Sequence, residues 1–333
     1  MKKIINEPQA FVDEFVEGIL LAHPTLLKAP GQDRRVLVRA DAPVAGKVGI
    51  ITGGGSGHLP LFKGYVGRGL CDGVAIGNVF SSPSSAQILE TTKAVDGGAG
   101  VLYLYGNYGG DVFNFDLATD MAELEGIRTM TVLGRDDVAS QPKERATDRR
   151  GVAGIFFAYK AAGAAAERGD SLDQVAAVAE DIIEHTATMG VGLSPTILPT
   201  TGKPSFELAD DEMEIGIGIH GEPGIHRGTL ETADEIAEHL VERLITDLGT
   251  ATGDRVAVLV NGLGATPLEE LYVLFRRTHQ ILEGKGITIA KNYVGEYATS
   301  LEMAGASISL LLLDDERLAL LNAPAESPFF REV

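Results

Sequence analysis

The sequence predicts an α/β protein of two α/β domains, the first built on a mostly parallel, doubly wound sheet flanked by helices. Three observations lead to this prediction. Short β-rich runs alternate with helical runs along the chain. Residues 101–105 are continuously apolar, as expected for a parallel strand that is buried on both faces. Many of the 41 glycines directly follow such runs, where sharp turns join strands to helices.

The first half of the chain contains a repeating strand, loop and helix pattern. Asn6 is expected to cap an opening helix with Pro8 in its first turn, and Ser82 to cap a later helix that begins at Pro83. The expected helices cover residues 8–23, 83–95 and 112–124, the expected strands cover residues 36–38, 48–51, 73–76, 101–105 and 127–133, and glycine loops follow at residues 53–58 and 106–111.

The second half continues with an alanine-rich helix that ends at Arg168 and a capping box, Ser171 to Gln174, that opens a helix to about residue 189. The glycine- and proline-rich residues 192–204 indicate a linker. We therefore expect an N-terminal domain of residues 1–190 and a C-terminal domain of residues 191–333. Beyond the linker, strands are expected at residues 213–219, 255–260, 287–289 and 308–313, and helices at residues 234–248 and 268–282.

The composition excludes several classes of function. A formal net charge of −19 argues against a surface that neutralises nucleic-acid phosphates or rests on anionic lipid. No run of about 18 uncharged apolar residues is present, and the first residues lack the apolar region of a signal peptide. The single cysteine, Cys71, excludes an internal disulfide and a multi-cysteine metal site. We expect a cytoplasmic protein whose partners are small molecules and other proteins.

Residues 216–221 satisfy the dinucleotide fingerprint G-x-G-x-x-G after an expected strand. The fingerprint requires a helix that starts at its last glycine and receives the pyrophosphate. Here Glu222, Pro223 and Gly224 interrupt any such helix. No P-loop segment exists either, so the sequence offers no nucleotide-binding motif.

Three polar residues stand beside the glycine-rich segments: His58, Asp111 and His220. Ligands of open α/β sheets bind in the crevice at the carboxyl ends of the strands, where such loops lie. The residues alone leave two interpretations open for each position. It is either a ligand-binding or catalytic group, or a structural residue at a sharp turn.

Six segments, in order along nearly the entire chain, match the motifs of one known family. They are Arg39-Ala40-Asp41-Ala42-Pro43-Val44-Ala45-Gly46-Lys47-Val48, residues 53–58, Asn107-Tyr108 with Gly110-Asp111, Gly202-Lys203-Pro204-Ser205-Phe206, residues 213–224, and residues 260–268. In these segments the chain resembles the K subunit of dihydroxyacetone kinases.

The resemblance implies a role for each of the three polar residues. The Nε2 atom of His220 adds to the ketone carbon of the substrate and gives a covalent hemiaminal, which polyols such as glycerol cannot form. His58 hydrogen-bonds the substrate and shuttles a proton, and Asp111 accepts the proton of the terminal hydroxyl as it attacks phosphorus. The resemblance also places Gly55, Ser56, Gly57 and Gly106 around the substrate.

The resemblance further implies a division of labour between proteins. A separate L subunit supplies Mg²⁺ and the adenine nucleotide, either as exchangeable ATP or as tightly bound ADP that a phosphotransferase-system M protein rephosphorylates. This chain itself is expected to bind no cofactor and no metal. A homodimer is implied, with no nucleic-acid or membrane partner.

Three positions depart from the dihydroxyacetone-specific pattern. Gly106 replaces a lysine, Gly109 replaces a small hydroxyl residue, and Leu59 replaces a glutamate. The loss of a long cationic side chain predicts room for a larger ketose, with the four-carbon erythruloses as first candidates. The alternative is a non-catalytic, ketose-sensing paralogue that acts as a coactivator, and the joint presence of His58, Asp111 and His220 favours the enzyme.

Overall fold

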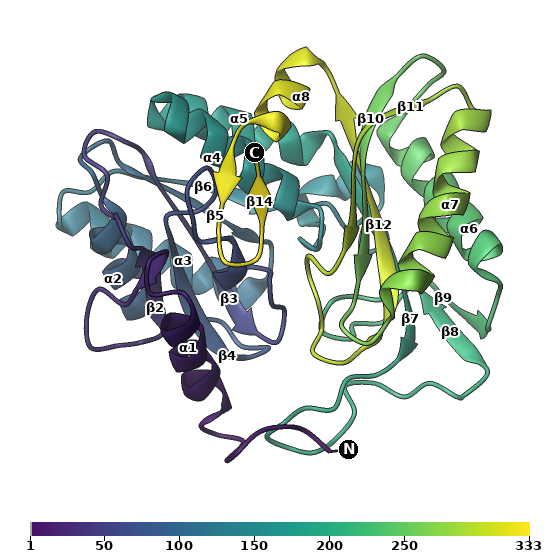
Figure 1. Ribbon diagram of the computed structural model, residues 1–333, viewed down its shortest axis with the longest axis horizontal. Coiled ribbons are helices and arrows are strands. Elements are labelled where there is room, and N and C mark those ends of the chain that lie inside the picture. Colours follow the sequence, from purple (N-terminus) through teal and green to yellow (C-terminus); the bar gives the residue numbers. More distant parts are fainter. Residues whose placement is uncertain (1) are drawn as a thin grey trace. The chain divides into compact units, whose positions relative to one another are not determined.

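The computed structural model describes residues 2–333, which divide into two compact units (Figure 1). Unit 1 comprises residues 2–134, 157–181 and 319–333, and unit 2 comprises residues 135–156 and 182–318. The chain therefore passes between the units several times, which no single boundary in the sequence can describe. The boundary expected between residues 190 and 191 falls inside strand β7 (Thr186–Ser194).

Unit 1 contains the mostly parallel sheet that the sequence predicts. Its strand order is β1-β2-β4-β3-β5-β6, in which β3 pairs in parallel with β4 and β5, and β5 with β6, while β1 and β2 form an antiparallel edge. The elements are α1 (Phe11–Ala22), β1 (Leu27–Lys28), β2 (Val36–Arg39), β3 (Gly49–Ser56), the 3₁₀ turn η1 (Lys63–Tyr65), β4 (Gly73–Val79), α2 (Ser85–Val95), β5 (Val101–Gly106), α3 (Gly109–Leu124), β6 (Thr129–Gly134), α4 (Ile155–Arg168), α5 (Leu172–Glu184), β13 (Ala325–Glu326) and β14 (Arg331–Glu332).

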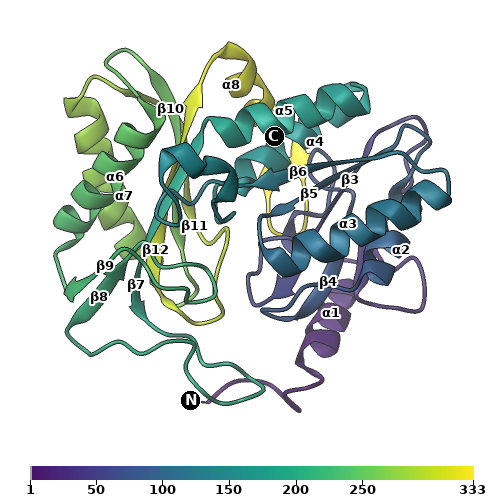
Figure 2. The ribbon, with the colours of Figure 1, turned by 180° about the vertical axis from the view of Figure 1, so that it is seen from behind.

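Helices lie on both faces of this sheet, as in a doubly wound fold. Neighbouring residues of a strand point to opposite faces. On β3, the Thr52 hydroxyl lies 2.8 Å from the Tyr159 hydroxyl of α4, whereas Gly53 faces Phe115 of α3. Helices α2 and α3 lie side by side on the α3 face (Figure 2). Their apolar side chains join the buried core of β3 and β5.

Unit 2 has a six-stranded sheet of order β11-β10-β12-β7-β8-β9, in which only β10 and β11 pair in parallel. Helices α6 and α7 pack side by side against it (Figures 1 and 2). The elements are the 3₁₀ turn η2 (Lys143–Asp148), β7, β8 (Glu212–Ile215), β9 (His226–Thr229), α6 (Ala233–Leu248), β10 (Arg255–Gly262), α7 (Leu268–Gly284), β11 (Thr288–Gly295), β12 (Ala304–Leu313) and α8 (Asp315–Asn322), whose last residues belong to unit 1.

Two expected elements of the second half are wrong in their extent. The helix expected to reach about residue 189 ends at Glu184, because the following residues pair with β12 as strand β7. The strand expected at residues 213–219 ends at Ile215, because Gly216 adopts φ +81° and turns the chain back towards β9. His220 therefore lies in a turn and not within a strand.

Corrections in the first half concern the starts of helices and one loop. Helix α1 begins at Phe11 without a side-chain cap, and the capping box of α2 is formed by Ser84 and Gln87, not by Ser82. The expected glycine loop at residues 53–58 is largely part of β3, which continues to Ser56. Likewise, α3 already begins at Gly109.

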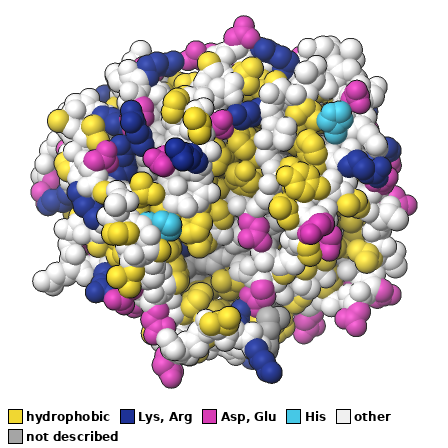
Figure 3. Space-filling model, viewed as in Figure 1, with side chains coloured by type: hydrophobic (Ala, Val, Ile, Leu, Met, Phe, Trp, Pro, Cys, Tyr) yellow, Lys and Arg dark blue, Asp and Glu magenta, His cyan; other side chains and the backbone are white. Residues whose placement is uncertain are grey.

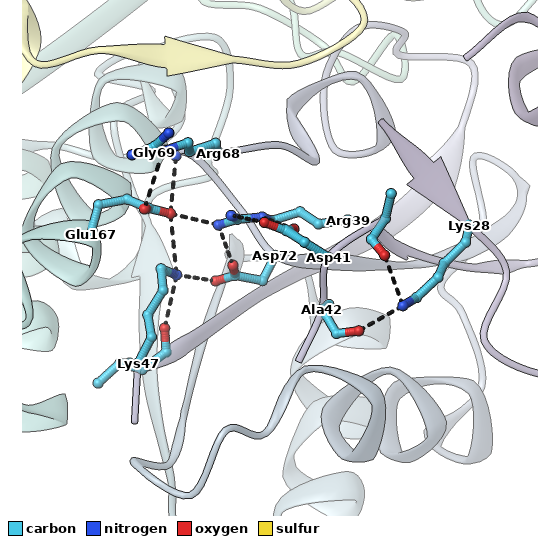
Figure 4. Close-up of polar contacts among 11 residues, drawn as sticks. Lys28, Arg39, Asp41, Ala42, Lys47, Arg68, Gly69, Asp72 and Glu167 are labelled. Carbon is cyan, nitrogen blue, oxygen red and sulfur yellow. Dashed lines mark hydrogen bonds and ion pairs between the residues drawn. The ribbon is translucent and has the colours of Figure 1, made fainter. Parts of the chain in front are cut away.

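A buried ion network joins several elements of unit 1 (Figure 4). The Asp72 carboxylate accepts hydrogen bonds from Arg39 (2.9 Å), from Lys47 (2.7 Å) and from the backbone N–H of Ile50 on β3 (2.9 Å). Arg39 also pairs with Glu167 of α4 at 2.5 Å. Arg39, Lys47 and Asp72 are all buried, so each charge depends on its partners. The network fixes the antiparallel edge of the sheet to its parallel part.

On the face seen in Figure 3, acidic and basic side chains are interspersed among neutral ones. Within residues 2–333, no helix combines the length and the apolar character needed to cross a bilayer.

Asp72→Ala should lower the free energy of unfolding by about 3–5 kcal/mol, because it leaves the buried cation of Lys47 without its nearest carboxylate and removes one of the carboxylates that pair with buried Arg39. Urea denaturation, followed through a spectroscopic signal from unit 1, measures this loss of unfolding free energy. Asp173→Ala, which removes the partner of exposed Arg128, is the control and should leave the urea midpoint unchanged. Equal midpoints for the two variants would show that the network does not stabilise the fold.

Candidate functional site

The end of β3 is built from three consecutive glycines that pack too tightly for side chains. A Cβ atom at Gly53 would meet the ring of Phe115 at 3.0 Å, one at Gly54 would meet Phe62 at 2.5 Å, and one at Gly55 would meet the backbone nitrogen of Ser81 at 2.7 Å. Contacts this short require the neighbouring backbone or rings to move. The glycines therefore let the segments around residues 62 and 80 pack directly on β3.

His58 follows this strand and is buried between aromatic rings. Gly57, at φ +108°, turns the chain at the strand end. The His58 ring stacks on Phe80, with centroids 5.0 Å apart, and meets Phe62 edge-on at 6.2 Å. Both phenylalanines have left-handed backbones, with φ of 54° and 66°, a conformation that is unfavourable for bulky residues. The fold maintains this strain at two residues that fix the orientation of one histidine ring.

Asp111 lies in the first turn of α3, directly after β5, and only 8% of it is exposed. A carboxylate is favoured at this end of a helix by the helix dipole. Burial, and then the charges of Asp116 and Asp111, raise the pKa of the Tyr105 hydroxyl on β5 above its ordinary value. A carboxylate in so little water is suited to accept a proton.

The structure brings His58 and Asp111 to the same edge of the unit 1 sheet, which we call the glycine edge and define as residues 55–58, 80–82 and 106–111. These residues follow the carboxyl ends of the parallel strands β3, β4 and β5. The segment after β4 contacts both neighbours: Phe80 stacks on His58, and the Ser82 hydroxyl accepts a hydrogen bond from Asn114 of α3 (3.2 Å). Gly55, Ser56, Gly57 and Gly106 belong to the same edge.

His220 belongs to unit 2, in the turn of residues 216–224 that joins β8 to β9, which we call the histidine turn. Its Nδ1 atom lies 2.8 Å from Oε1 of Glu222, and its backbone N–H donates to Oε2 of the same carboxylate at 2.9 Å. Burial alone raises the pKa of Glu222, but the hydrogen bond and charge of His220, with backbone N–H donors, lower it to about 2. The side chain of His220 is 25% exposed, so a small molecule can reach its ring.

Arg150, from the segment before α4, lies beside the histidine turn. Its Nη1 atom lies 3.9 Å from Glu222, and its Nε atom donates to Asp137 at 2.8 Å. Sequence reasoning missed Glu222, Arg150 and the two phenylalanines Phe62 and Phe80. Glu222 could have been found as the only acidic residue beside His220, but nothing in the sequence indicates the ring contacts of Phe80.

No group of three or more His, Cys, Asp or Glu side chains in residues 2–333 is arranged to hold a metal ion.

The chain matches the family model described as the Dak1 domain over residues 17–329. It is also 45% identical, over 99% of both chains, to the dihydroxyacetone-binding subunit DhaK of PTS-dependent dihydroxyacetone kinase 2 from Listeria innocua. The chain belongs to this DhaK-like Dak1 family. The family assignment made from the sequence motifs is thereby confirmed.

Other relatives are longer than this chain, or are described as something other than a dihydroxyacetone-binding subunit. An L-erythrulose kinase of Pectobacterium atrosepticum is 42% identical over 100% of this chain but only 56% of its own length. The structure of the dihydroxyacetone kinase from C. freundii with AMP-PNP and Mg²⁺ superposes with a TM-score of 0.89 at 29% identity, covering 99% of this chain and 61% of the kinase. The dihydroxyacetone kinase operon co-activator Dha-DhaQ has a TM-score of 0.87 at 35% identity, with 96% and 97% covered. One Dak1 fold thus occurs in kinases and in a co-activator.

Gly55→Ala should destabilise this Dak1 protein by about 1–3 kcal/mol, because the added methyl group overlaps with the backbone of Phe80 and Ser81. Gly109→Ala is the matched control, since a Cβ there meets nothing within 4 Å and alanine favours the helix. Thermal unfolding of both variants measures the difference. A Gly55→Ala protein as stable as the Gly109→Ala protein would contradict the packing argument.

Proposed function

We propose that this chain is the ketose-binding subunit of a dihydroxyacetone-kinase-type phosphotransferase, which holds dihydroxyacetone or a related short ketose for phosphorylation of its terminal hydroxyl. The observation that carries the proposal is the 45% identity to a dihydroxyacetone-binding subunit over 99% of both chains. The accessible ring of His220 and the buried carboxyl of Asp111 provide the two kinds of group that the chemistry needs.

His220 captures the substrate in this proposal. A neutral imidazole has a nucleophilic nitrogen near pH 7, and a ketone carbon is electrophilic. Addition of Nε2 to that carbon gives a hemiaminal, which holds a small ketose more firmly than a few hydrogen bonds can. A polyol of the same size has no carbonyl and is rejected by its reactivity as well as by its shape.

His58 and Asp111 act on the oxygen atoms of the substrate. His58, whose ring is fixed by Phe80 and Phe62, donates a hydrogen bond to a substrate oxygen and shuttles the proton that addition to the carbonyl requires. Asp111 accepts the proton of the terminal hydroxyl as that oxygen attacks phosphorus. The backbones of Gly55, Ser56, Gly57 and Gly106 line the substrate.

A partner supplies the phosphoryl group. The crystal structure of the related C. freundii kinase contains AMP-PNP and Mg²⁺. The present chain matches 61% of that kinase chain. This supports a nucleotide site in the part of the kinase that the present chain does not match. We propose a separate L subunit with ATP, or with ADP that a phosphotransferase-system M protein rephosphorylates, and a homodimer of the present chain. No cofactor binds to this chain itself in the proposal.

The substrate of this chain is a four-carbon ketose in the sharper form of the proposal. A Cβ atom at Gly109 would meet nothing within 4 Å apart from its chain neighbours and the backbone of its own helix, so packing does not require a glycine at this position near Asp111. Leu59 and Gly106 are two further departures from the dihydroxyacetone-specific pattern. The 42% identity to an L-erythrulose kinase agrees with this assignment.

A ketose-sensing co-activator is the second candidate, supported by the TM-score of 0.87 to Dha-DhaQ. Such a protein would bind a ketose without turning it over. Assays with an L subunit therefore separate the two functions.

His220→Asn and Asp111→Asn should fail at different steps of the reaction. We expect His220→Asn to lose the covalent adduct, and Asp111→Asn to retain the adduct while transfer falls about 10²–10⁴-fold, because a general base is lost. Intact-mass spectrometry detects the adduct as the full mass of one ketose without loss of water, and a coupled assay with L subunit and ATP measures transfer.

His226→Asn is the control for the first variant, because His226 is an exposed histidine of β9 in the same unit. An adduct that persists in His220→Asn, or that needs loss of one water as a lysine Schiff base does, would exclude the assigned nucleophile.

Turnover with L subunit and ATP should be faster with at least one erythrulose enantiomer than with dihydroxyacetone. Gly109→Ser, which adds a hydroxymethyl group beside Asp111, should shift the ratio of kcat/KM values towards dihydroxyacetone by roughly tenfold, the scale of a small steric change in a pocket. Faster turnover of dihydroxyacetone by the unaltered protein would refute the four-carbon assignment, and turnover of no ketose would favour the co-activator.

A further inference from the structure

The carboxylate of Glu222 determines which nitrogen of His220 carries a proton. Its Oε1 atom lies 2.8 Å from Nδ1. An ionised carboxylate only accepts hydrogen bonds, so Nδ1 must be the donor. A neutral imidazole carries one proton, which leaves the lone pair on Nε2. The other oxygen of Glu222 accepts the backbone N–H of His220 at 2.9 Å, so the carboxylate and the ring are fixed in one orientation.

Arg150 connects this pair to the core of unit 2. Its Nε and Nη2 atoms each lie 2.8 Å from Oδ2 of Asp137, whose Oδ1 accepts the N–H of Ala139 at 3.0 Å. Nη1 of the same guanidinium faces Glu222 at 3.9 Å. The anchored cation thus stands beside the carboxylate that contacts the histidine.

Gly218 makes this arrangement possible. A Cβ atom at this position would overlap with both the carboxylate of Glu222 and Nη1 of Arg150. The backbone N–H of Gly218 also donates to the carbonyl of Glu222 at 2.9 Å, which closes the histidine turn. The second glycine of the misleading G-x-G-x-x-G pattern is therefore explained by the space that Glu222 and Arg150 need.

We propose that Glu222 and Arg150 are positioning residues for His220: Arg150 holds the carboxylate of Glu222 in place, and Glu222 directs the Nε2 lone pair of the ring to the ketone carbon. This inference rests on the proposed capture of a ketose by His220 and deepens it. The cation of Arg150 stands 3.9 Å from Glu222 and favours the ionised carboxylate that accepts the Nδ1–H of the ring.

The step balances without a further reagent. The Nε2 lone pair forms a bond to the carbonyl carbon, and the π electrons of the carbonyl move to its oxygen. The ring is then an imidazolium whose Nδ1–H is held by Glu222, and the oxygen is an alkoxide. Loss of the Nδ1 proton and gain of one proton by the alkoxide give the neutral hemiaminal, so that N–H has been added across the carbonyl. Glu222 stabilises the cationic stage.

Other charged groups of unit 2 near the histidine turn are already paired. Glu214 of β8 pairs with Arg227 of β9 at 2.5 Å and accepts the backbone N–H of Gly224 at 2.6 Å. Asp137 and the adjacent buried Asp136 stand behind Arg150, where Asp136 accepts the backbone N–H groups of Val152 and Gly154. Glu222 contacts His220 directly, and Arg150 stands beside Glu222.

The first test is ¹⁵N NMR of the histidine rings in the ketose-free protein. We expect the Nδ1–H tautomer for His220, assigned by comparison with His220→Asn. In Glu222→Gln this tautomer preference should be lost, because an amide can donate to Nδ1. Glu214→Gln is the matched control, since it changes the same residue type in the adjoining strand and should leave the tautomer unaltered. An Nε2–H tautomer in the unaltered protein overturns the proposal without any variant.

The second test follows the rate of adduct formation against pH by intact mass. Glu222→Gln should slow formation at neutral pH at least about tenfold. Arg150→Met should also slow formation, because Glu222 loses the cation beside it, and Arg150→Lys should restore part of the rate. A purely structural role would lower stability without changing the rate of adduct formation.

Different results would contradict the proposed function and the positioning roles of Glu222 and Arg150. If the unaltered protein forms no adduct with any short ketose, the proposed function is wrong, while the NMR tautomer still tests the role of Glu222. If the unaltered protein forms the adduct but Glu222→Gln and Arg150→Met form it with the same rate and pH profile as Glu214→Gln, the positioning roles are wrong.

Discussion

The absence of side chains at Gly53, Gly54 and Gly55 is the constraint on which the candidate site in unit 1 depends. These residues lie at the carboxyl end of β3, a central strand of the sheet, and their backbone is in contact with Phe115, Phe62 and the segment around Phe80. Methyl groups there would push the loops after β3 and β4 outward. His58 would then lose the ring stacking that orients it. The sheet order, the buried ion network at Asp72 and the glycines together place His58 and Asp111 at one edge.

The two histidines of the proposed mechanism have opposite surroundings that suit opposite tasks. His58 is buried between aromatic rings, where little water competes for a proton that it transfers. His220 is partly exposed in a turn, with one ring nitrogen bound to Glu222 and the other directed away from that bond. A buried ring suits directed proton transfer, and a partly exposed ring suits attack on a carbonyl. The proposed mechanism thus gives the same residue type two roles, because the backbone and the neighbours of the two rings differ.

Much of the architecture was predictable from local patterns, because alternation, apolar runs and capping boxes are local properties. The buried run before Gly106 and the helix around Leu240 were expected and are confirmed. The first residues of strand β7 were expected to end a helix and its last residues to begin a linker, because its alanine, threonine and methionine residues suit either structure and only pairing with β12 decides. The two compact units also interleave along the chain, which depends on long-range contacts that no local pattern contains.

The site was predictable only in part. His58, Asp111 and His220 stand beside glycines, which is visible in the sequence, and the family motifs supplied their expected roles. Arg150 is separated from Glu222 by a long stretch of chain and meets it only after the sheet of unit 2 has formed. The backbone strain at Phe62 and Phe80 likewise arises from packing against glycines. Such contacts are tertiary, so propensity and spacing do not reveal them.

The central claim is that His220 forms a covalent bond to the carbonyl carbon of a ketose. ¹³C NMR of the protein mixed with dihydroxyacetone labelled at its carbonyl carbon tests this most directly. The account predicts a protein-bound resonance in the range of a tetrahedral carbon bonded to oxygen and nitrogen, which is absent in His220→Asn. A bound resonance that stays in the ketone range, or a tetrahedral one that persists without His220, would contradict it.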